Sequence, residues 1–145
     1  MHIYVDADAC PVKEIIERVA KENSIPVTMV IDVNHILMSD YSEIAVVSQG
    51  ADSADLYLIN RVQKGDIVVS QDYGVASLAL GKGAKAVSNS GLVFTNDNID
   101  KLLFERFLGK KIRKAPKGKR TMPHNRKRTQ DDDFEFEKSL RELIK

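Results

Sequence analysis

The chain has 145 residues, 43% of them hydrophobic, which is enough for one folded domain and argues against a disordered chain. The net charge of +1 hides an asymmetry, because residues 1–109 carry −6, residues 110–128 carry +10 and residues 129–145 carry −3. No apolar run approaches the roughly 18 residues of a membrane span, and the N-terminus has no signal-peptide pattern. Since the lone Cys10 also excludes an intramolecular disulfide, we expect a cytoplasmic protein.

Short apolar strands alternate with helical stretches over residues 1–109, which favours one α/β domain with a mainly parallel sheet. The expected strands, in chain order, cover residues 2–6, 26–31, 44–47, 66–70 and 85–87. The expected helices cover residues 11–22, 51–62 and 73–80, and a last one, capped by Asn98 or Asp100, ends near residue 108. Residues 32–43 are expected to form a loop.

The remaining residues are predicted to form an arm and a final helix. Residues 110–128 lack apolar periodicity and contain two prolines and a glycine, which predicts an extended or mobile basic arm. Its side chains could neutralise the phosphates of a nucleic acid: Lys110, Lys111, Arg113, Lys114, Lys117, Lys119, Arg120, Arg126, Lys127 and Arg128. Residues 129–145 begin with a capping-box pattern and continue as an amphipathic helix.

Five aspartates follow three of the predicted strands: Asp6, Asp8, Asp52, Asp55 and Asp72. Because ligands bind at the carboxyl ends of strands in an open parallel sheet, these acids could converge on one spot. Two carboxylates at ~4 Å repel by roughly 4 kcal/mol at an effective dielectric of ~20. A hard cation such as Mg²⁺ or Mn²⁺ would relieve that repulsion, so the pattern predicts a metal site.

Each acid also has a structural explanation, and both explanations stay open at this point. Asp6 or Asp8 could terminate a strand or cap a helix, and Asp72 suits the N-cap of the helix that follows it. Asp52 and Asp55 could simply favour the first turn of their helix. Their spacing of three, however, puts both on the helix face that packs inward, which favours a role in a site.

Other polar residues carry weaker signals. Ser53 and Ser70 are candidates for orienting the carboxylates. Cys10 precedes a predicted helix, but a small buried cysteine is the better interpretation. The histidines are not at metal-ligand spacing: His2, His35 and His124.

Three segments, residues 5–12, 50–55 and 65–74, resemble the YaiI/YqxD family of bacterial proteins, which is similar to the PIN-like nuclease superfamily. The resemblance implies a three-layer α/β/α sandwich. It also implies that Mg²⁺ or Mn²⁺ is held by three acids or acid pairs: Asp6, Asp55 (alone or with Asp52) and Asp72. PIN domains often carry a further glutamate, for which Glu43 is only a guess here.

Together these patterns predict a metal-dependent nuclease that hydrolyses RNA, more readily single-stranded RNA. Asp6, Asp55 and Asp72 would be catalytic, and Asp8 and Asp52 would assist in metal binding. A haloacid-dehalogenase-like phosphatase using Asp6 and Asp8 is one alternative. A non-catalytic RNA-binding or ribosome-associated adaptor using the basic arm is another. The final helix could dock a protein partner or a second copy of the chain.

Overall fold

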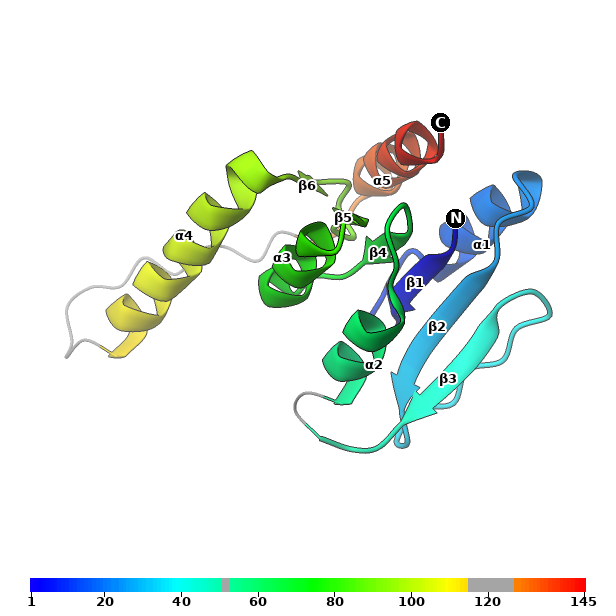
Figure 1. The fold of residues 1–145 in the computed structure, drawn as a ribbon, viewed down its shortest axis with the longest axis horizontal. Helices are drawn as coiled ribbons and strands as arrows, with labels where there is room; N and C mark the ends of the chain where they lie inside the picture. Colours follow the sequence, from blue (N-terminus) through cyan, green and yellow to red (C-terminus); the bar gives the residue numbers. More distant parts are fainter. Residues whose placement is uncertain (51–52, 115–126) are drawn as a thin grey trace.

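A six-stranded sheet forms the centre of the protein in a computed structural model that describes residues 1–50, 53–114 and 127–145 (Figure 1). Its strands, in spatial order, are β3 (Glu43–Val47), β2 (Val27–Asp32), β1 (Ile3–Asp6), β4 (Ile67–Val69), β5 (Lys85–Val87) and β6 (Val93–Phe94). The pairings from β3 to β5 are parallel, and β6 pairs with β5 in the antiparallel direction. The chain order reverses between β1 and β4, which is where ligands bind in folds of this kind.

Helices cover both faces of the sheet. One face packs against α1 (Lys13–Glu22) and α5 (Gln130–Ile144). The other packs against α2 (Ser53–Arg61) and α3 (Tyr73–Gly81), with α4 (Asn96–Lys114) lying against α3. The predicted three-layer α/β/α architecture with a mainly parallel sheet is therefore confirmed.

The period of two along the strands explains the two layers of core. In β1, Ile3 and Val5 are buried against α1 and α5, whereas Tyr4 between them is buried on the opposite face. In β4, Val68 likewise faces the α2–α3 side while its neighbours face the other. The sheet therefore buries both of its faces, as parallel sheets do.

The C-terminal helix α5 belongs to this core. Its residues Phe136 and Leu140 are fully buried against the α1 face of the sheet. A Cβ on Gly91 would lie 2.7 Å from the backbone oxygen of Glu135, so only glycine allows this close approach of the β5–β6 turn to α5. The predicted capping box at the start of α5 is confirmed, with the Thr129 backbone N–H donating to the Asp132 carboxylate at 2.9 Å.

Several predicted boundaries were wrong. Helix α1 begins at Lys13, not at residue 11. Helix α4 begins at Asn96 and is capped by Thr95, whose Oγ1 accepts the Asn98 N–H at 3.1 Å while the Asn98 side chain accepts the Thr95 N–H. The same helix runs on to Lys114, into the stretch predicted to be an arm. Strand β6 was not predicted.

The structure also bears on the membrane prediction. Within the described ranges, none of the helices combines the length and apolar character that a membrane span requires.

Candidate metal centre at the carboxyl edge of the sheet

The two central strands of the sheet end side by side in aspartates. Asp6 is the last residue of β1, and Asp72 closely follows β4, the neighbour of β1. Both acids line a cleft of about 330 Å³ together with Gln71, Tyr73 and Arg106. This cleft lies at the point where the strand order reverses, as the topology requires of a ligand site.

The pKa of the Asp6 carboxyl group reflects the convergence of the acids around it. Its burial raises its pKa, and the negative charges of Asp55, Asp8 and Asp72 raise it further, to about 6. The hydroxyl of Ser70 acts in the opposite direction, because it lies 3.4 Å from Asp6 Oδ2 as a hydrogen-bond donor. Acids from β1, from α2 and from the β4–α3 junction therefore share one electrostatic environment.

Asp72 caps a helix and also lines the cleft. Its Oδ1 accepts the backbone N–H groups of Gly74 at 2.8 Å and Val75 at 3.2 Å, so Asp72 is the N-cap of α3. The same oxygen lies 3.8 Å from the guanidinium of Arg106. Asp72 thus begins a helix and also presents its carboxylate to the cleft.

Ser70 connects the two central acids. It is buried, its hydroxyl donates to Asp6, and it accepts the backbone N–H of Asp72 at 3.0 Å. The first contact can orient the Asp6 carboxylate, whereas the second holds the backbone of Asp72. The role of Ser70 in orienting the carboxylates of a site stays a prediction.

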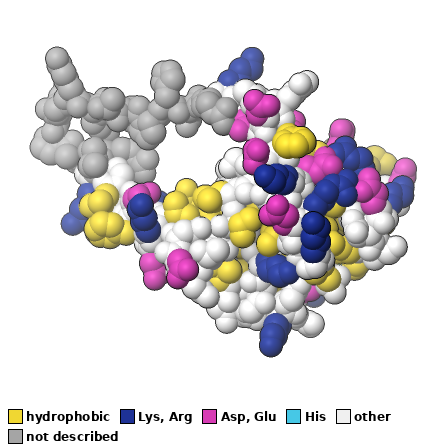
Figure 2. Space-filling view, turned by 90° about the horizontal axis from the view of Figure 1, so that it is seen from above, with side chains coloured by type: hydrophobic (Ala, Val, Ile, Leu, Met, Phe, Trp, Pro, Cys, Tyr) yellow, Lys and Arg dark blue, Asp and Glu magenta, His cyan; other side chains and the backbone are white. Residues whose placement is uncertain are grey.

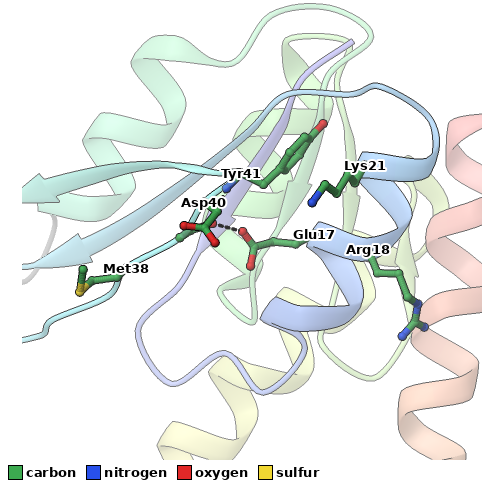
Figure 3. Close-up of a pocket in the computed structure, with 7 residues that line it drawn as sticks. Glu17, Arg18, Lys21, Met38, Asp40 and Tyr41 are labelled. Atoms are coloured by element: carbon green, nitrogen blue, oxygen red, sulfur yellow. Dashed lines mark hydrogen bonds between the residues drawn. The ribbon is translucent and has the colours of Figure 1, made fainter.

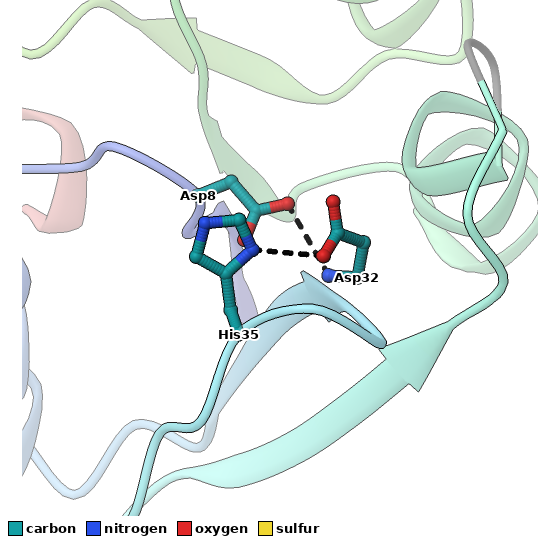
Figure 4. Close-up of side chains that lie close together, drawn as sticks. All are labelled: Asp8, Asp32 and His35. Atoms are coloured by element: carbon teal, nitrogen blue, oxygen red, sulfur yellow. Dashed lines mark hydrogen bonds and ion pairs between the residues drawn. The ribbon is translucent and has the colours of Figure 1, made fainter.

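A second group of side chains, Asp8, Asp32 and His35, lies beside the first at the end of β2 (Figure 4). His35 Nδ1 is 2.8 Å from Asp32 Oδ1 and 3.1 Å from Asp8 Oδ1. Its hydrogen bond with Asp32 is the main cause that raises the pKa of His35 and lowers the pKa of Asp32. The imidazole therefore occupies a position between two carboxylates that favours a positive charge.

The Asp8 carboxylate provides a test of whether these residues suit a metal ion. Its Oδ2 accepts the backbone N–H of Asp32 at 3.2 Å, whereas its buried Oδ1 accepts no well-aligned hydrogen bond from any described residue, although the His35 ring is near. A buried carboxylate oxygen of this kind calls for a partner. Carboxylate oxygens suit Mn²⁺ or Mg²⁺, so Asp8 and Asp32 fit a divalent cation. His35 would have to lose its proton to join them as a ligand, and its hydrogen bond with Asp32 opposes that loss.

The turn that carries Asp8 is strained. Ala9 has φ +58°, in the left-handed region, where a residue with a Cβ is disfavoured by about 1 kcal/mol or more. Strain of this kind persists only where the surroundings impose it, and it is often found at binding sites. Cys10 next to it is buried as predicted, and burial raises the pKa of its thiol, so Cys10 is not an activated nucleophile.

The other candidates from the sequence lie elsewhere. Asp52 lies outside the described residues. Ser53 shares a hydrogen bond with Ser48, at 3.1 Å between their hydroxyl oxygens. Glu43, the guessed additional acid, is at the amino end of β3 and hence at the edge of the sheet opposite to the aspartates.

The basic residues predicted to contact nucleic acid divide into three groups. The first four, Lys110, Lys111, Arg113 and Lys114, fall within the last turns of α4. The next four lie outside the described residues: Lys117, Lys119, Arg120 and Arg126. Of the last two, Lys127 is exposed, whereas Arg128 Nε donates to Asp133 Oδ1 at 2.7 Å and so contacts the first turn of α5.

Sequence reasoning did not include Asp32, His35 or Arg106 in the site. Asp32 had the same signal as Asp6, since it ends an apolar strand. The only sequence signal for His35 was its position three residues after Asp32. For Arg106 the only signal was its position on a predicted helix, and the structure shows that this helix packs beside the cleft.

A second hollow, of about 480 Å³, lies between α1 and the segment before β3 (Figure 3). Its polar groups engage other parts of the protein: Glu17 accepts hydrogen bonds from Ser39 and, at 2.7 Å, from Ser42, and Arg18 pairs with Glu137 of α5. It brings none of the site aspartates together. The smaller cleft at Asp6 and Asp72 is therefore the better candidate for chemistry.

Comparison with known proteins identifies close relatives. A family model described as "Uncharacterized BCR, YaiI/YqxD family" matches residues 4–145. The chain is 56% identical to a UPF0178 protein of Clostridium acetobutylicum, over 99% of the chain and 97% of that relative. It is also 56% identical to a UPF0178 protein of Lachnoclostridium phytofermentans, over 100% of the chain and 97% of that relative. No solved structure matches the chain.

Proposed function

Since the chain belongs to the YaiI/YqxD family, whose description names no activity, we propose its function from the site itself: metal-dependent hydrolysis of RNA, as in PIN-like nucleases. One observation carries this proposal. Burial, and then the charges of acids from three separate segments, destabilise the ionised form of Asp6 at the end of β1 and raise its pKa to about 6. A cluster of like charges is costly by itself, and a divalent cation would offset that cost.

Asp6, Asp55 and Asp72 would hold the cation, and Asp8, which is also close to Asp32 and His35, would extend the site toward a second one. Asp52 would assist from the start of α2. A divalent cation in such a site neutralises phosphodiester charge and lowers the pKa of water. Ser70 would keep Asp6 oriented by its hydrogen bond, and the Arg106 guanidinium would attract a phosphate into the cleft.

The charge distribution supports a nucleic acid as the substrate. Residues 110–128 carry +10 and begin in the last turns of α4, the helix whose Arg106 lines the cleft. Such a segment would bind the phosphates of single-stranded RNA, with a salt slope of about −0.7 for each phosphate engaged. The substrate would therefore approach along α4 toward the acids.

Cleavage of labelled single-stranded RNA by metal-free protein, with and without added Mn²⁺, tests this function. The wild type should cleave only with the metal, and Asp6→Asn and Asp72→Asn should each lower the rate at least about 100-fold. Asparagine at position 72 can still cap α3, so this variant separates chemistry from folding. Asp40→Asn, an exposed acid outside the cleft, should cleave like the wild type.

Cleavage that survives both substitutions would rule out this site. Each alternative function predicts a different result with the same protein and variants. A phosphatase would form a covalent phosphate on Asp6 during turnover of a phosphate monoester. An adaptor would bind RNA equally well before and after the aspartate substitutions and would cleave none.

A further inference from the structure

The inner side of helix α4 packs against the rest of the fold. Ile99 is buried, and Leu102 and Leu103 are partly buried, against the α2–α3 side of the core. Arg106 continues this side and reaches the cleft beside Asp72. The helix then extends beyond α3, as Figure 1 shows, and among the described elements its main packing partner is α3.

The outer side of α4 carries large apolar side chains without a described partner layer. Phe104, Phe107 and Leu108 are between 41% and 59% exposed. At 100° per residue these three side chains share one face, which points away from the face of Ile99 and Arg106. Figure 2 shows hydrophobic side chains mixed with charged ones at the end of the molecule that carries α4. Three exposed residues of this size on one face indicate a docking surface.

Charges flank this apolar centre in a definite order. Asp100 precedes it on the same face, one turn before Phe104, and Lys111 follows it, one turn after Phe107. The Lys111 ammonium lies 5.0 Å from the centre of the Phe107 ring. Along the line of Asp100, Phe104, Phe107 and Lys111 the outer face is therefore acidic, then apolar, then basic. The exposed Lys101 lies at the border of this face, beside Leu108.

We propose that this face pairs with the same face of a second copy of the chain, with the two α4 helices antiparallel. A two-fold axis between Glu105 and Arg106 places Asp100 as far from the axis as Lys111, and Phe104 as far as Phe107. Each Asp100 then meets the partner's Lys111, and the phenylalanines meet at the centre. A single surface that is complementary to itself is what a two-fold dimer requires.

The alternative occupants fit this face less well. A nucleic acid would meet Asp97 and Asp100 near the start of the outer face, and these acids repel phosphates. The face also points away from the cleft, so it does not guide a strand toward the aspartates. Because one helix pair buries less than a standard interface of roughly 1,600 Å², the dimer should be weak, with a dissociation constant in the micromolar range.

Sedimentation velocity of the full chain, from about 1 to 200 μM, tests the pairing. The wild type should dimerise over this range, and Phe107→Glu should weaken the dimer by more than about tenfold. Asp100→Lys and Lys111→Asp should each weaken it about tenfold, since each places like charges opposite one another at two symmetric positions. An equimolar mixture of these two variants should recover the wild-type affinity, because each then supplies the charge that the other lacks.

Weakening by each single variant, followed by recovery in the mixture, is specific to an antiparallel α4 pair. In a parallel pair, position 100 would face position 100 of the partner and position 111 would face position 111. Like charges would then oppose one another in the wild type and in both variants, so neither single variant would weaken the dimer relative to the wild type. A monomer at the highest concentration, a dimer that Phe107→Glu leaves unchanged, or a mixture without recovery would each overturn the proposal. A gel shift of RNA that Phe107→Glu abolishes, in a chain that stays monomeric, would instead assign the face to nucleic acid.

Discussion

At the scale of single residues, the carboxyl of Asp6 has a measurable effect on stability. Its pKa is raised from 3.8 to about 6 in the fold, first by burial and then by the neighbouring acids. The folded protein therefore binds this proton more tightly than the unfolded chain does. The resulting stabilisation is present below about pH 4 and is lost as the pH rises through about 6, so at pH 7 ionised Asp6 destabilises the metal-free protein.

Asp6→Asn should therefore stabilise the metal-free protein at pH 7. A shift of this size corresponds to at most about 3 kcal/mol, and solvent screening of a partly exposed carboxyl reduces it to about 1–2 kcal/mol. Urea unfolding in EDTA at pH 7 and at pH 4.5 measures it, and the difference between variant and wild type should shrink at the lower pH. A variant that is less stable than the wild type at pH 7 would contradict the crowding of the carboxylates.

The residues of the site differ in how far sequence could predict them. Asp6 and Asp72 could be placed together because each follows an apolar strand, and parallel strands end at one edge. Asp32 follows the same rule at the end of β2 but came at the start of a stretch with no clear periodicity. His35 depends on the path of the turn after β2, and neither composition nor spacing determines that path.

At the scale of elements, α5 should contribute to the stability of the whole fold. Leu140 is fully buried between α5 and the sheet, so Leu140→Ala should cost about 2–5 kcal/mol. Phe134 provides the matched control on the same helix, because its side chain is 69% exposed. Phe134→Ala should change the free energy of unfolding by no more than about 0.5 kcal/mol.

Urea unfolding followed by circular dichroism distinguishes the two α5 variants. A single transition, shifted to lower urea in Leu140→Ala, is expected because Leu140 belongs to the same buried cluster as Ile3 and Val5 of β1. A wild-type midpoint for Leu140→Ala, or a separate transition of α5, would mean that this helix is not part of the cooperative core.

Elements with strong apolar patterns were predictable, and those with short or mixed patterns were not. The five parallel strands follow directly from their apolar runs. Strand β6 has only two residues, too few for a period to be detected. The end of α4 was missed because Gly109 and the basic residues after it lack apolar periodicity, although lysine and arginine are good helix formers.

At the scale of the whole molecule, metal binding should be linked to folding. The acids come from β1, from α2 and from the β4–α3 junction, so they are close together only in the folded chain. A cation that binds this arrangement and not the unfolded chain stabilises the fold by RT ln(1 + [L]/Kd). In this proposal, the topology of the sheet is what brings the metal ligands together.

Mn²⁺ at about 100 times its dissociation constant should stabilise the wild type by about 2.7 kcal/mol, which raises Tm by roughly 5–10 °C for a chain of this length. Asp6→Asn and Asp72→Asn should lose most of this shift, whereas Asp40→Asn should keep it. The shift should also shrink between pH 7 and pH 5, because protons compete for Asp6, whose pKa is about 6. Thermal melts in EDTA and in Mn²⁺ measure these differences. An equal Mn²⁺ shift in all four proteins would place the binding elsewhere, since only a cation held by the converging carboxylates depends on Asp6 and Asp72 together.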